Sequence, residues 1–96
     1  MEREIVVDNE YGKLELEFYQ GIPLLHLDIY QWSHNILKTK LLPIWCSFLR
    51  EMKDGGHNVV LAVIPITAAK KQKLCYLFGM HEANRDNEHI IVRRWL

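Results

Sequence analysis

The sequence predicts one α+β domain built on a mixed, mostly antiparallel sheet with two helices. Residues 13–19 and 24–30 alternate apolar and polar side chains, which is the period of two that a half-buried strand shows. Residues 33–54 repeat apolar side chains at helical spacing, and residues 59–64 form a β-branched run that is apolar on both faces. The predicted order over residues 1–96, taken as a single domain, is β-β-β-α-β-α-β-β.

The N-terminal third predicts three antiparallel strands. Residues 4–7 are a short strand candidate, and residues 8–12 indicate a turn through their Asx residues and glycine. Residues 20–23 make a tight connection between the next two strands, which are therefore predicted to form a hairpin. The apolar faces of that hairpin carry Leu14, Leu16 and Phe18, then Leu25, Leu27 and Ile29.

A long helix is predicted from Ser33 to the glycines at 55–56. Ser33 suits the N-cap because its hydroxyl can accept a hydrogen bond from a free amide of the first turn. Pro43 lies inside the helix and has no N–H to donate, so a kink or a restart is expected there. The apolar stripe comprises Leu37, Leu41, Trp45, Phe48, Leu49 and Met52.

The C-terminal half predicts a strand, a helix and a hairpin. The strand at 57–64 ends at Pro65, and Thr67 is expected to cap a helix that runs to Phe78. On this helix the side chains expected to face inward are Leu74, Leu77 and Phe78, and those expected to face outward are Lys70, Lys71 and Lys73. The final hairpin is predicted as strand 80–83, turn 84–87 and strand 89–95.

Charge is balanced overall but unevenly distributed along the chain. Residues 1–31 carry seven acids and two bases, whereas residues 32–96 carry five acids and ten bases, so the net charge is zero. The two parts either attract each other within one fold or offer a polar docking surface to a partner. The neutral total argues against nucleic-acid binding, and no apolar stretch is long enough for a membrane span.

Several side chains are candidates for chemistry, each with a structural alternative. His26 lies beside Glu15 or Glu17 across the predicted hairpin, which suits a general acid–base pair, and the alternative is a solvated polar face. Cys46 and Cys75 lie in apolar or helical contexts without CxxC spacing, so both are expected to fill core space. The five histidines show no zinc-ligand spacing, and no metal is expected.

Two tryptophans, Trp32 and Trp95, are not needed by the predicted core. Tryptophan and arginine are enriched in the residues that dominate protein interfaces. Trp32, Trp95 and the adjacent Arg93 and Arg94 are therefore candidates for binding a protein partner or a second copy of the chain.

The segment from Val59 to Met80 combines a buried strand, a Pro/Thr break, a basic helix and the turn at 77–80. It resembles the GNAT acyltransferase motif in which a helix ends in a Leu-Gly-Phe-like turn, and residues 90–96 fit that family's last strands. The resemblance covers about residues 12–96 and implies a truncated GNAT-like fold with the first and last hairpins at opposite sheet edges. More narrowly, the chain is similar to short GNAT-like proteins of tailed phages, including internal virion proteins of podoviruses.

The chain departs from that family at its cofactor loop. Active GNAT enzymes grip the pyrophosphate of acetyl-CoA with an Arg/Gln-x-x-Gly-x-Gly/Ala loop, whose backbone amides hold the phosphates. The matching residues 31–36 contain no glycine. The candidate cofactor-binding residues there are Ser33, His34 and Asn35. The family's frequent general-acid tyrosine corresponds to Cys75, and the catalytic candidate Tyr76 stands one residue later.

These departures lead to two hypotheses. The first is a non-enzymatic GNAT-like phage protein that binds protein, as a virion component or on a host factor, without a cofactor, in the host cytoplasm or virion and not secreted. The alternative is a divergent N-acetyltransferase that uses acetyl-CoA. An enzyme should splay the parallel strands at 24–30 and 57–64 to leave a slot, whereas a binder should have this slot closed or filled, with Trp32 as the candidate plug.

Overall fold

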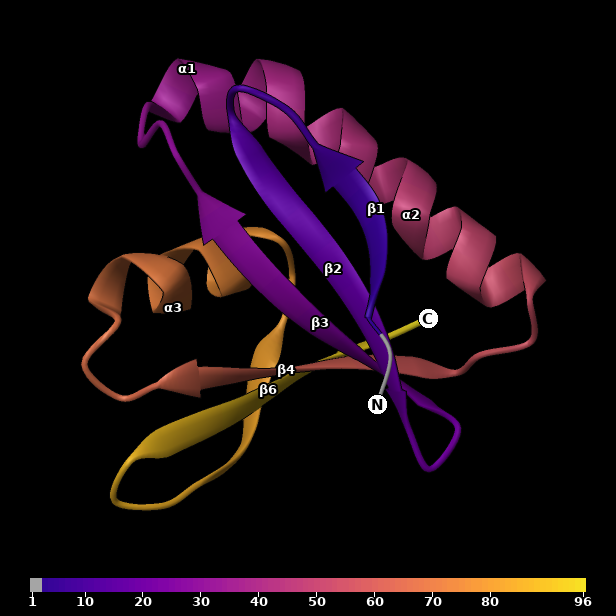
Figure 1. The fold of residues 1–96 in the computed structure, drawn as a ribbon. Coiled ribbons are helices and arrows are strands. Elements are labelled where there is room, and N and C mark those ends of the chain that lie inside the picture. The colour runs from indigo at the N-terminus through magenta and orange to yellow at the C-terminus, as the bar shows by residue number, and fades with distance from the viewer. Residues whose placement is uncertain (1–2) are drawn as a thin grey trace.

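The structure, a computed structural model, describes residues 3–96 and has the predicted order of elements (Figure 1). The strands are β1 (Glu4–Asp8), β2 (Gly12–Tyr19), β3 (Ile22–Ile29), β4 (Val59–Pro65), β5 (His81–Arg85) and β6 (His89–Trp95). The helical segments are α1 (His34–Ile36), η1 (Leu37–Leu41), α2 (Leu42–Asp54) and α3 (Ala69–Leu77). None of the helices described is long and apolar enough to cross a membrane.

The six strands form one mixed sheet in the order β1-β2-β3-β4-β6-β5. Only β3 and β4 pair in parallel, and every other neighbouring pair among these strands is antiparallel. The predicted mixed, mostly antiparallel sheet is therefore confirmed. The acidic N-terminal hairpin and the basic C-terminal hairpin lie at opposite edges, as the resemblance implies.

The helices α2 and α3 pack against the same face of the sheet. The Trp45 indole Nε1 on α2 donates a hydrogen bond of 2.9 Å to the Phe78 carbonyl oxygen at the end of α3. The two rings also stack, with 5.2 Å between their centroids. We call this side of the sheet the covered face and the other side the open face. The core on the covered face includes Leu14, Leu16, Leu25, Val60, Ala62, Ile64, Ile90 and Val92 from the strands.

The long helix behaves as its apolar stripe and its proline predict. Leu41, Trp45 and Phe48 are buried on one side of it. The five residues of η1 take a π-helical form, and α2 then starts with Pro43 in its first turn. The expected restart is confirmed, because a proline in the first turn of a helix loses no intrahelical hydrogen bond. Ser33 occupies the N-cap position, although its hydroxyl makes no capping bond.

Two predicted side-chain directions are wrong. Cys46 is exposed instead of filling core space, because it follows Trp45 and one helical residue turns the side chain by about 100°. Leu77 is 52% exposed, and Cys75 takes the inward position next to Leu74. The apolar residues of this short basic helix do not form one continuous stripe. Their spacing in the sequence therefore could not predict which side of the helix is buried.

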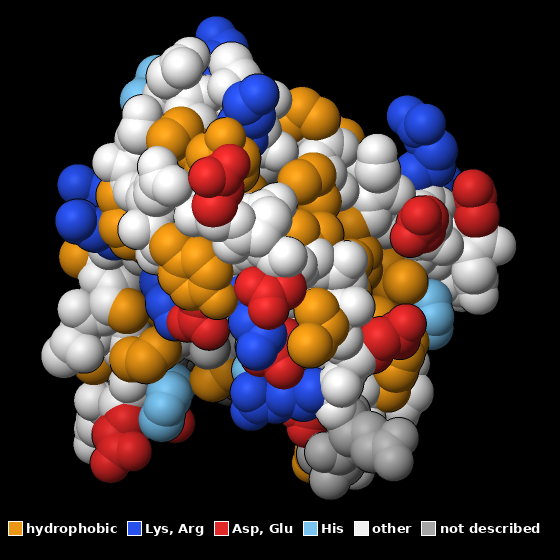
Figure 2. Space-filling model, turned by 45° about the horizontal axis from the view of Figure 1, so that its top comes forward, with side chains coloured by type: hydrophobic (Ala, Val, Ile, Leu, Met, Phe, Trp, Pro, Cys, Tyr) orange, Lys and Arg blue, Asp and Glu red, His pale blue; other side chains and the backbone are white. Residues whose placement is uncertain are grey.

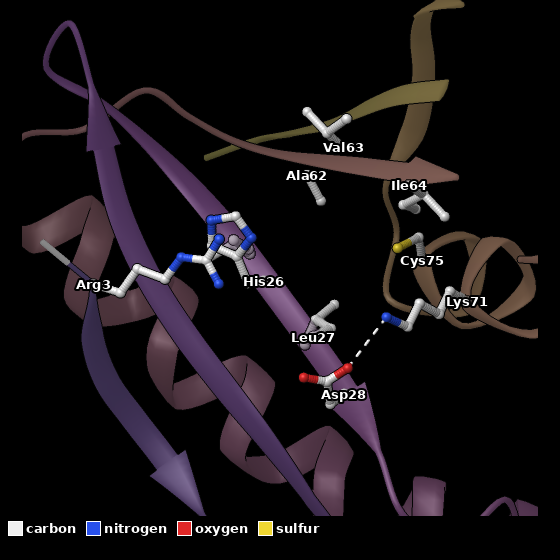
Figure 3. A pocket seen from close by; sticks show the side chains of 10 residues that line it. Arg3, His26, Leu27, Asp28, Ala62, Val63, Ile64, Lys71 and Cys75 are labelled. Carbon is white, nitrogen blue, oxygen red and sulfur yellow. Dashed lines mark hydrogen bonds and ion pairs between the residues drawn. The ribbon is translucent and has the colours of Figure 1, made fainter. Parts of the chain in front are cut away.

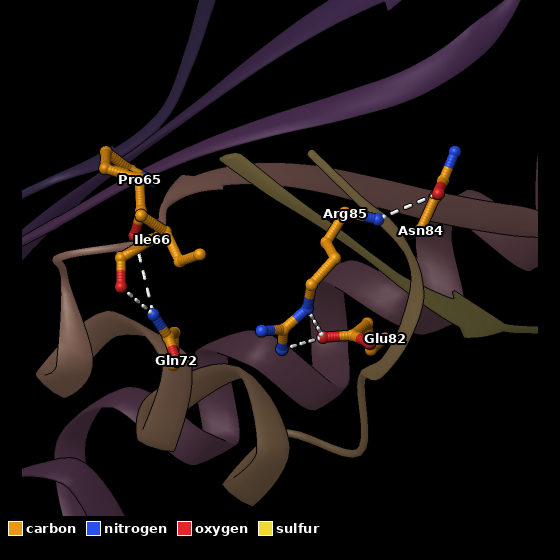
Figure 4. A network of polar contacts seen from close by, with 6 residues as sticks. All are labelled: Pro65, Ile66, Gln72, Glu82, Asn84 and Arg85. Atoms are coloured by element: carbon orange, nitrogen blue, oxygen red, sulfur yellow. Dashed lines mark hydrogen bonds and ion pairs between the residues drawn. The ribbon is translucent and has the colours of Figure 1, made fainter. Parts of the chain in front are cut away.

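The start of α3 also differs from the prediction. The helix begins at Ala69 with Ala68 as its N-cap, and Thr67 does not cap it. The Gln72 side-chain amide instead donates to the carbonyl oxygen of Ile66 at 2.9 Å, as Figure 4 shows. An interior side chain thus reaches back to secure the segment that leads from β4 into the helix.

The last hairpin is shifted relative to its predicted bounds. Strand β5 begins at His81, one residue later than predicted, and extends to Arg85 into the predicted turn, while Met80 is fully buried where the chain leaves α3. The turn is closed by the Asp86 carboxylate, which accepts hydrogen bonds from the backbone N–H groups of Glu88 and His89, both at 2.7 Å. These bonds lower the pKa of Asp86 because they favour its charged form. The Arg85 guanidinium pairs with Glu82 along the exposed strand (Figure 4).

Arg94 lies on the covered face, in contrast to its neighbours Arg93 and Trp95. It is half-buried, its guanidinium is 3.5 Å from the Gly79 carbonyl oxygen, and its Nε has no hydrogen-bond partner. Gly79 has a φ of +80°, and a Cβ at this position would collide with the guanidinium. The turn after α3 therefore needs glycine for two independent reasons.

Trp45→Ala should destabilise the domain by about 3–5 kcal/mol, because it removes a buried aromatic ring and leaves the Phe78 carbonyl without its donor. Trp32→Ala is the matched control, since Trp32 is 38% exposed and should cost less than about 1 kcal/mol. Urea unfolding of both variants measures the difference. Equal midpoints for the two variants would contradict the helix facing described above.

Gly79→Ala should cost clearly more than Gly21→Ala. Both glycines have a φ of +80°, so both variants carry the left-handed strain of about 1–2 kcal/mol. A Cβ at Gly21 meets nothing within 4 Å, whereas a Cβ at Gly79 meets Arg94. The gap between their unfolding free energies therefore measures the Arg94 contact, and Arg94→Ala should narrow it. Identical losses for the two glycine variants would show that Arg94 moves aside freely.

Candidate functional site

A slot opens in the sheet where the parallel strands separate. Strands β3 and β4 pair only at Leu24 with Leu61 and at Leu25 with Ala62. Beyond these pairs the strands diverge, and α3 lies in the opening between them (Figure 1). A cavity of about 220 Å³ occupies the gap (Figure 3). The splay expected of an acyltransferase is therefore present in the described chain, and the closed or filled slot expected of a protein binder is not found.

The slot has an apolar floor and a charged mouth. Leu25, Ala62, Ile64 and Cys75 line the floor from the covered face. The polar groups that line it are Arg3, His26, Asp28 and Lys71. The Lys71 ammonium is 3.3 Å from the Asp28 carboxylate, which joins α3 to β3 across the mouth (Figure 3). Both partners are substantially exposed, so the ion pair is weak and could open for a ligand.

Cys75 is the one thiol that faces the slot. Burial raises the pKa of Cys75 to about 12, while the nearby Lys71 ammonium acts in the opposite direction. The side chain therefore stays a neutral thiol at physiological pH and is not an activated nucleophile. Cysteine fills space here, as the sequence predicts.

Glu17 and His26 come together as the sequence predicts. The His26 Nε2 atom lies 3.0 Å from a Glu17 carboxylate oxygen, across the β2–β3 pairing. Glu17 is only 8% exposed, and His26 lines the slot. Glu15, the other acid considered beside His26, pairs with Lys13 at 3.6 Å instead. An imidazole held by a carboxylate is a group that can take up and release a proton at the slot.

Tyr76 does not reach the slot. Its side chain is 45% exposed, whereas its neighbour Cys75 is among the residues that line the cavity. Consecutive helical residues differ by about 100° in direction, which accounts for the difference. The structure therefore does not bring this catalytic candidate to Glu17 and His26.

The candidate cofactor loop lies on another side of α3 from the slot: Lys71 and Cys75 line the slot, whereas Lys70, Lys73 and Leu77 line the cavity beside the loop. Ser33 is extended, with φ −124° and ψ 132°, and every residue from 31 to 36 carries a side chain. Trp32 stands beside this helix start with the Lys70 ammonium 5.7 Å from its ring centroid. The glycine backbone that grips a pyrophosphate has no counterpart here, so these residues do not fit the acetyl-CoA cradle of an active GNAT enzyme.

Trp32 does not plug the slot, and that expectation is wrong. It lines a separate cavity of about 270 Å³ between the helix start and α3. His34 lines this second cavity too, with Leu37, Lys70 and Lys73. Among the described residues, no group of three or more His, Cys, Asp or Glu side chains could hold a metal ion.

The open face carries exposed apolar side chains that the sequence pattern did not reveal as a group. The exposed ones placed on it by the strand register are Ile5, Tyr19, Ile22, Val63 and Trp95. Arg93 shares this face, with its guanidinium 5.1 Å from the Trp95 ring centroid. Strand alternation predicts two faces, but only the placement of both helices on one side shows that the other is uncovered.

Comparison with solved structures identifies the fold. The chain matches a domain from Methanocaldococcus jannaschii with a TM-score of 0.69 and 18% identity, over 90% of this chain and 56% of that one. It matches the Campylobacter jejuni N-acetyltransferase PseH with a TM-score of 0.67 and 10% identity, over 88% and 59%. It matches the Vibrio fischeri ribosomal-protein-S5-alanine acetyltransferase with a TM-score of 0.64 and 10% identity, over 88% of this chain and 54% of that one.

These matches cover most of this chain but just over half the length of each solved structure. No family model matches the sequence, and no curated protein sequence matches it. At such low identity the likeness concerns the fold and does not carry an activity. The chain has a GNAT-like fold, truncated relative to these acetyltransferases.

The buried thiol gives a pH-dependent prediction. The unfolded chain releases the Cys75 proton near the ordinary pKa of 9.0, whereas the folded chain holds it to about 12. Folding stability should therefore fall as pH rises through this window. Cys75→Ala should show a smaller alkaline loss of unfolding free energy than the wild type, and Cys46→Ala should follow the wild type. Parallel pH profiles for all three proteins would contradict the burial of this thiol.

Proposed function

We propose that the chain is a non-enzymatic GNAT-like protein that acts by binding protein. The observation that carries the proposal is the open face, where Trp95, Val63 and Ile22 are exposed together on one side of the sheet. A contiguous apolar surface rimmed by charge is typical of a protein interaction site. Figure 2 shows that exposed apolar side chains are interspersed with acidic and basic ones on the side of the molecule it presents.

The cofactor loop supports the same proposal. Residues 31–36 contain no glycine, and the bulky Trp32 side chain stands at the helix start. Without close backbone approach, the pyrophosphate of acetyl-CoA loses its main source of binding energy in this fold. The catalytic candidate Tyr76 is also turned away from the slot.

The proposal extends to a phage origin. It rests on the similarity of residues 12–96 to the short GNAT-like proteins of tailed phages, including podovirus internal virion proteins. A protein of that kind acts either as a component of the virion or on a host factor in the host cytoplasm. Both roles need a binding surface and neither needs a cofactor.

The second candidate function is a divergent N-acetyltransferase that uses acetyl-CoA. The open slot between β3 and β4 favours it, as does the His26–Glu17 pair beside the slot. In that case the pair would manage the proton of an attacking amine, and Lys70 or Lys73 near Trp32 would have to replace the missing phosphate cradle.

Calorimetry with acetyl-CoA decides between the two. We expect a dissociation constant weaker than about 10 μM, equivalent to less than about 7 kcal/mol of binding free energy. Coenzyme A without the acetyl group serves as the control ligand, and Lys70→Glu as the control variant. Tighter binding that Lys70→Glu abolishes would overturn the protein-binding proposal in favour of the enzyme.

A further inference from the structure

The second cavity, of about 270 Å³, lies between α3 and the segment that follows β3. The chain leaves β3 and enters α1 on the same side of the molecule as α3 (Figure 1). The walls of the cavity are apolar, with Leu74 and Leu77 from α3 and with Trp32 and Leu37 from the other segment. Leu77 is 52% exposed and Trp32 is 38% exposed, so both present apolar surface to a ligand. The exposure of Leu77, which its spacing did not predict, thus gives the cavity one of its walls.

The charged groups that line the second cavity are basic. Lys70 and Lys73 line it, together with His34. Among residues 3–96, neither of these lysines takes part in an ion pair. The Lys70 ammonium instead lies 5.7 Å from the centroid of the Trp32 ring, whose face attracts a cation. The cavity therefore combines an apolar interior with two cations that no described carboxylate balances.

The two segments that form the walls carry no acid. Residues 31–41 and 66–80 contain five lysines and neither aspartate nor glutamate. The acids on neighbouring elements are engaged elsewhere. The Asp28 carboxylate on β3 is paired across the mouth of the slot. The Glu10 carboxylate accepts a hydrogen bond from the Tyr11 side chain, which raises the pKa of that tyrosine. The positive charge at the second cavity is therefore not neutralised by acids of the described fold.

These features fit a short acidic segment of another protein. An apolar side chain of such a segment can pack between Leu74, Leu77 and Trp32 while flanking carboxylates reach Lys70 and Lys73. The cavity is smaller than the roughly 300–1,000 Å³ of typical ligand pockets, which suits one anchoring side chain better than a whole nucleotide. Single-stranded nucleic acids bind to grooves in which successive bases stack on aromatic rings, whereas this cavity has one aromatic ring besides its histidine.

We propose that the second cavity binds an acidic peptide segment of a protein partner through an apolar anchor side chain. The inference rests on the proposed protein-binding function and gives that function a surface other than the open face. In such a complex the buried anchor supplies most of the affinity. The lysines supply selectivity for acidic segments and speed association.

Fluorescence anisotropy with a labelled synthetic peptide tests the proposal. The peptide has two central leucines with three glutamates on either side, and it should bind with a dissociation constant below about 1 mM. A control peptide with lysines in place of the glutamates, and another with alanines in place of the leucines, should each bind at least about tenfold more weakly. Binding of the acidic peptide weaker than about 1 mM, or equal binding of the acidic and basic peptides, would overturn the proposal.

A charge exchange tests the role of the two lysines. The double variant Lys70→Glu, Lys73→Glu should bind the acidic peptide at least about tenfold more weakly than the wild type, and should prefer the basic peptide. Lys53→Glu is the matched control, because Lys53 is exposed at the end of α2 and does not line the cavity. Circular dichroism checks that each variant folds. A folded double variant that keeps the preference of the wild type, or an equal loss in Lys53→Glu, contradicts the assignment.

The indole N–H signals in a ¹⁵N NMR spectrum locate the peptide. The Trp32 signal, assigned with Trp32→Phe, should shift on binding, while the Trp95 signal on the open face should stay. A shift of Trp95 in place of Trp32 overturns this inference and leaves the protein-binding function standing on the open face. An oligonucleotide of equal charge that binds more tightly than the peptide also overturns it. Failure of the function itself is distinguished by tight acetyl-CoA binding, which none of these outcomes requires.

Discussion

The short parallel pairing between β3 and β4 is the constraint on which the rest of the structure depends. It joins the β1–β3 part of the sheet to the β4–β6–β5 part through only two Cα pairs. Because the strands part immediately afterwards, α3 must close the gap from one side, and its Phe78 carbonyl is held there by Trp45 of α2. The slot follows from that seam, and so does the position of α3 beside it.

The seam belongs to the backbone of the fold, whereas a site for acetyl-CoA depends on a few side chains and glycines. The splay is a property of the backbone and survives at about 10–18% identity to solved structures. Binding of a nucleotide cofactor depends on a few residues, and residues 31–36 carry side chains where the family's loop has glycines. The slot and the His26–Glu17 pair beside it are therefore present in a chain whose residues 31–36 lack the glycines of the family's cofactor loop.

Much of the fold could be predicted from the sequence because its strongest signals are periodic. Alternation identified the β2–β3 hairpin, and the stripe through Trp45 identified the long helix and its buried side. Prediction failed where the signal was local: α3 is short and has no capping hydroxyl, so its start and the direction of Leu77 were wrong. The contact between Glu17 and His26 was predictable from the hairpin register. The surroundings of Trp32 were not, because they depend on where α3 lies in the folded chain.

The uneven charge of the chain is used only in part by ion pairs within the fold. Among residues 3–96, Lys71–Asp28 is the one ion pair that joins the acidic N-terminal part to the basic C-terminal part. Lys13–Glu15 and His26–Glu17 lie within the first part, and Arg85–Glu82 lies within the second. Attraction within the fold thus uses little of the separated charge. Most of the separated charge therefore lies on the solvated surface, where an exposed ion pair contributes only about 0–1 kcal/mol.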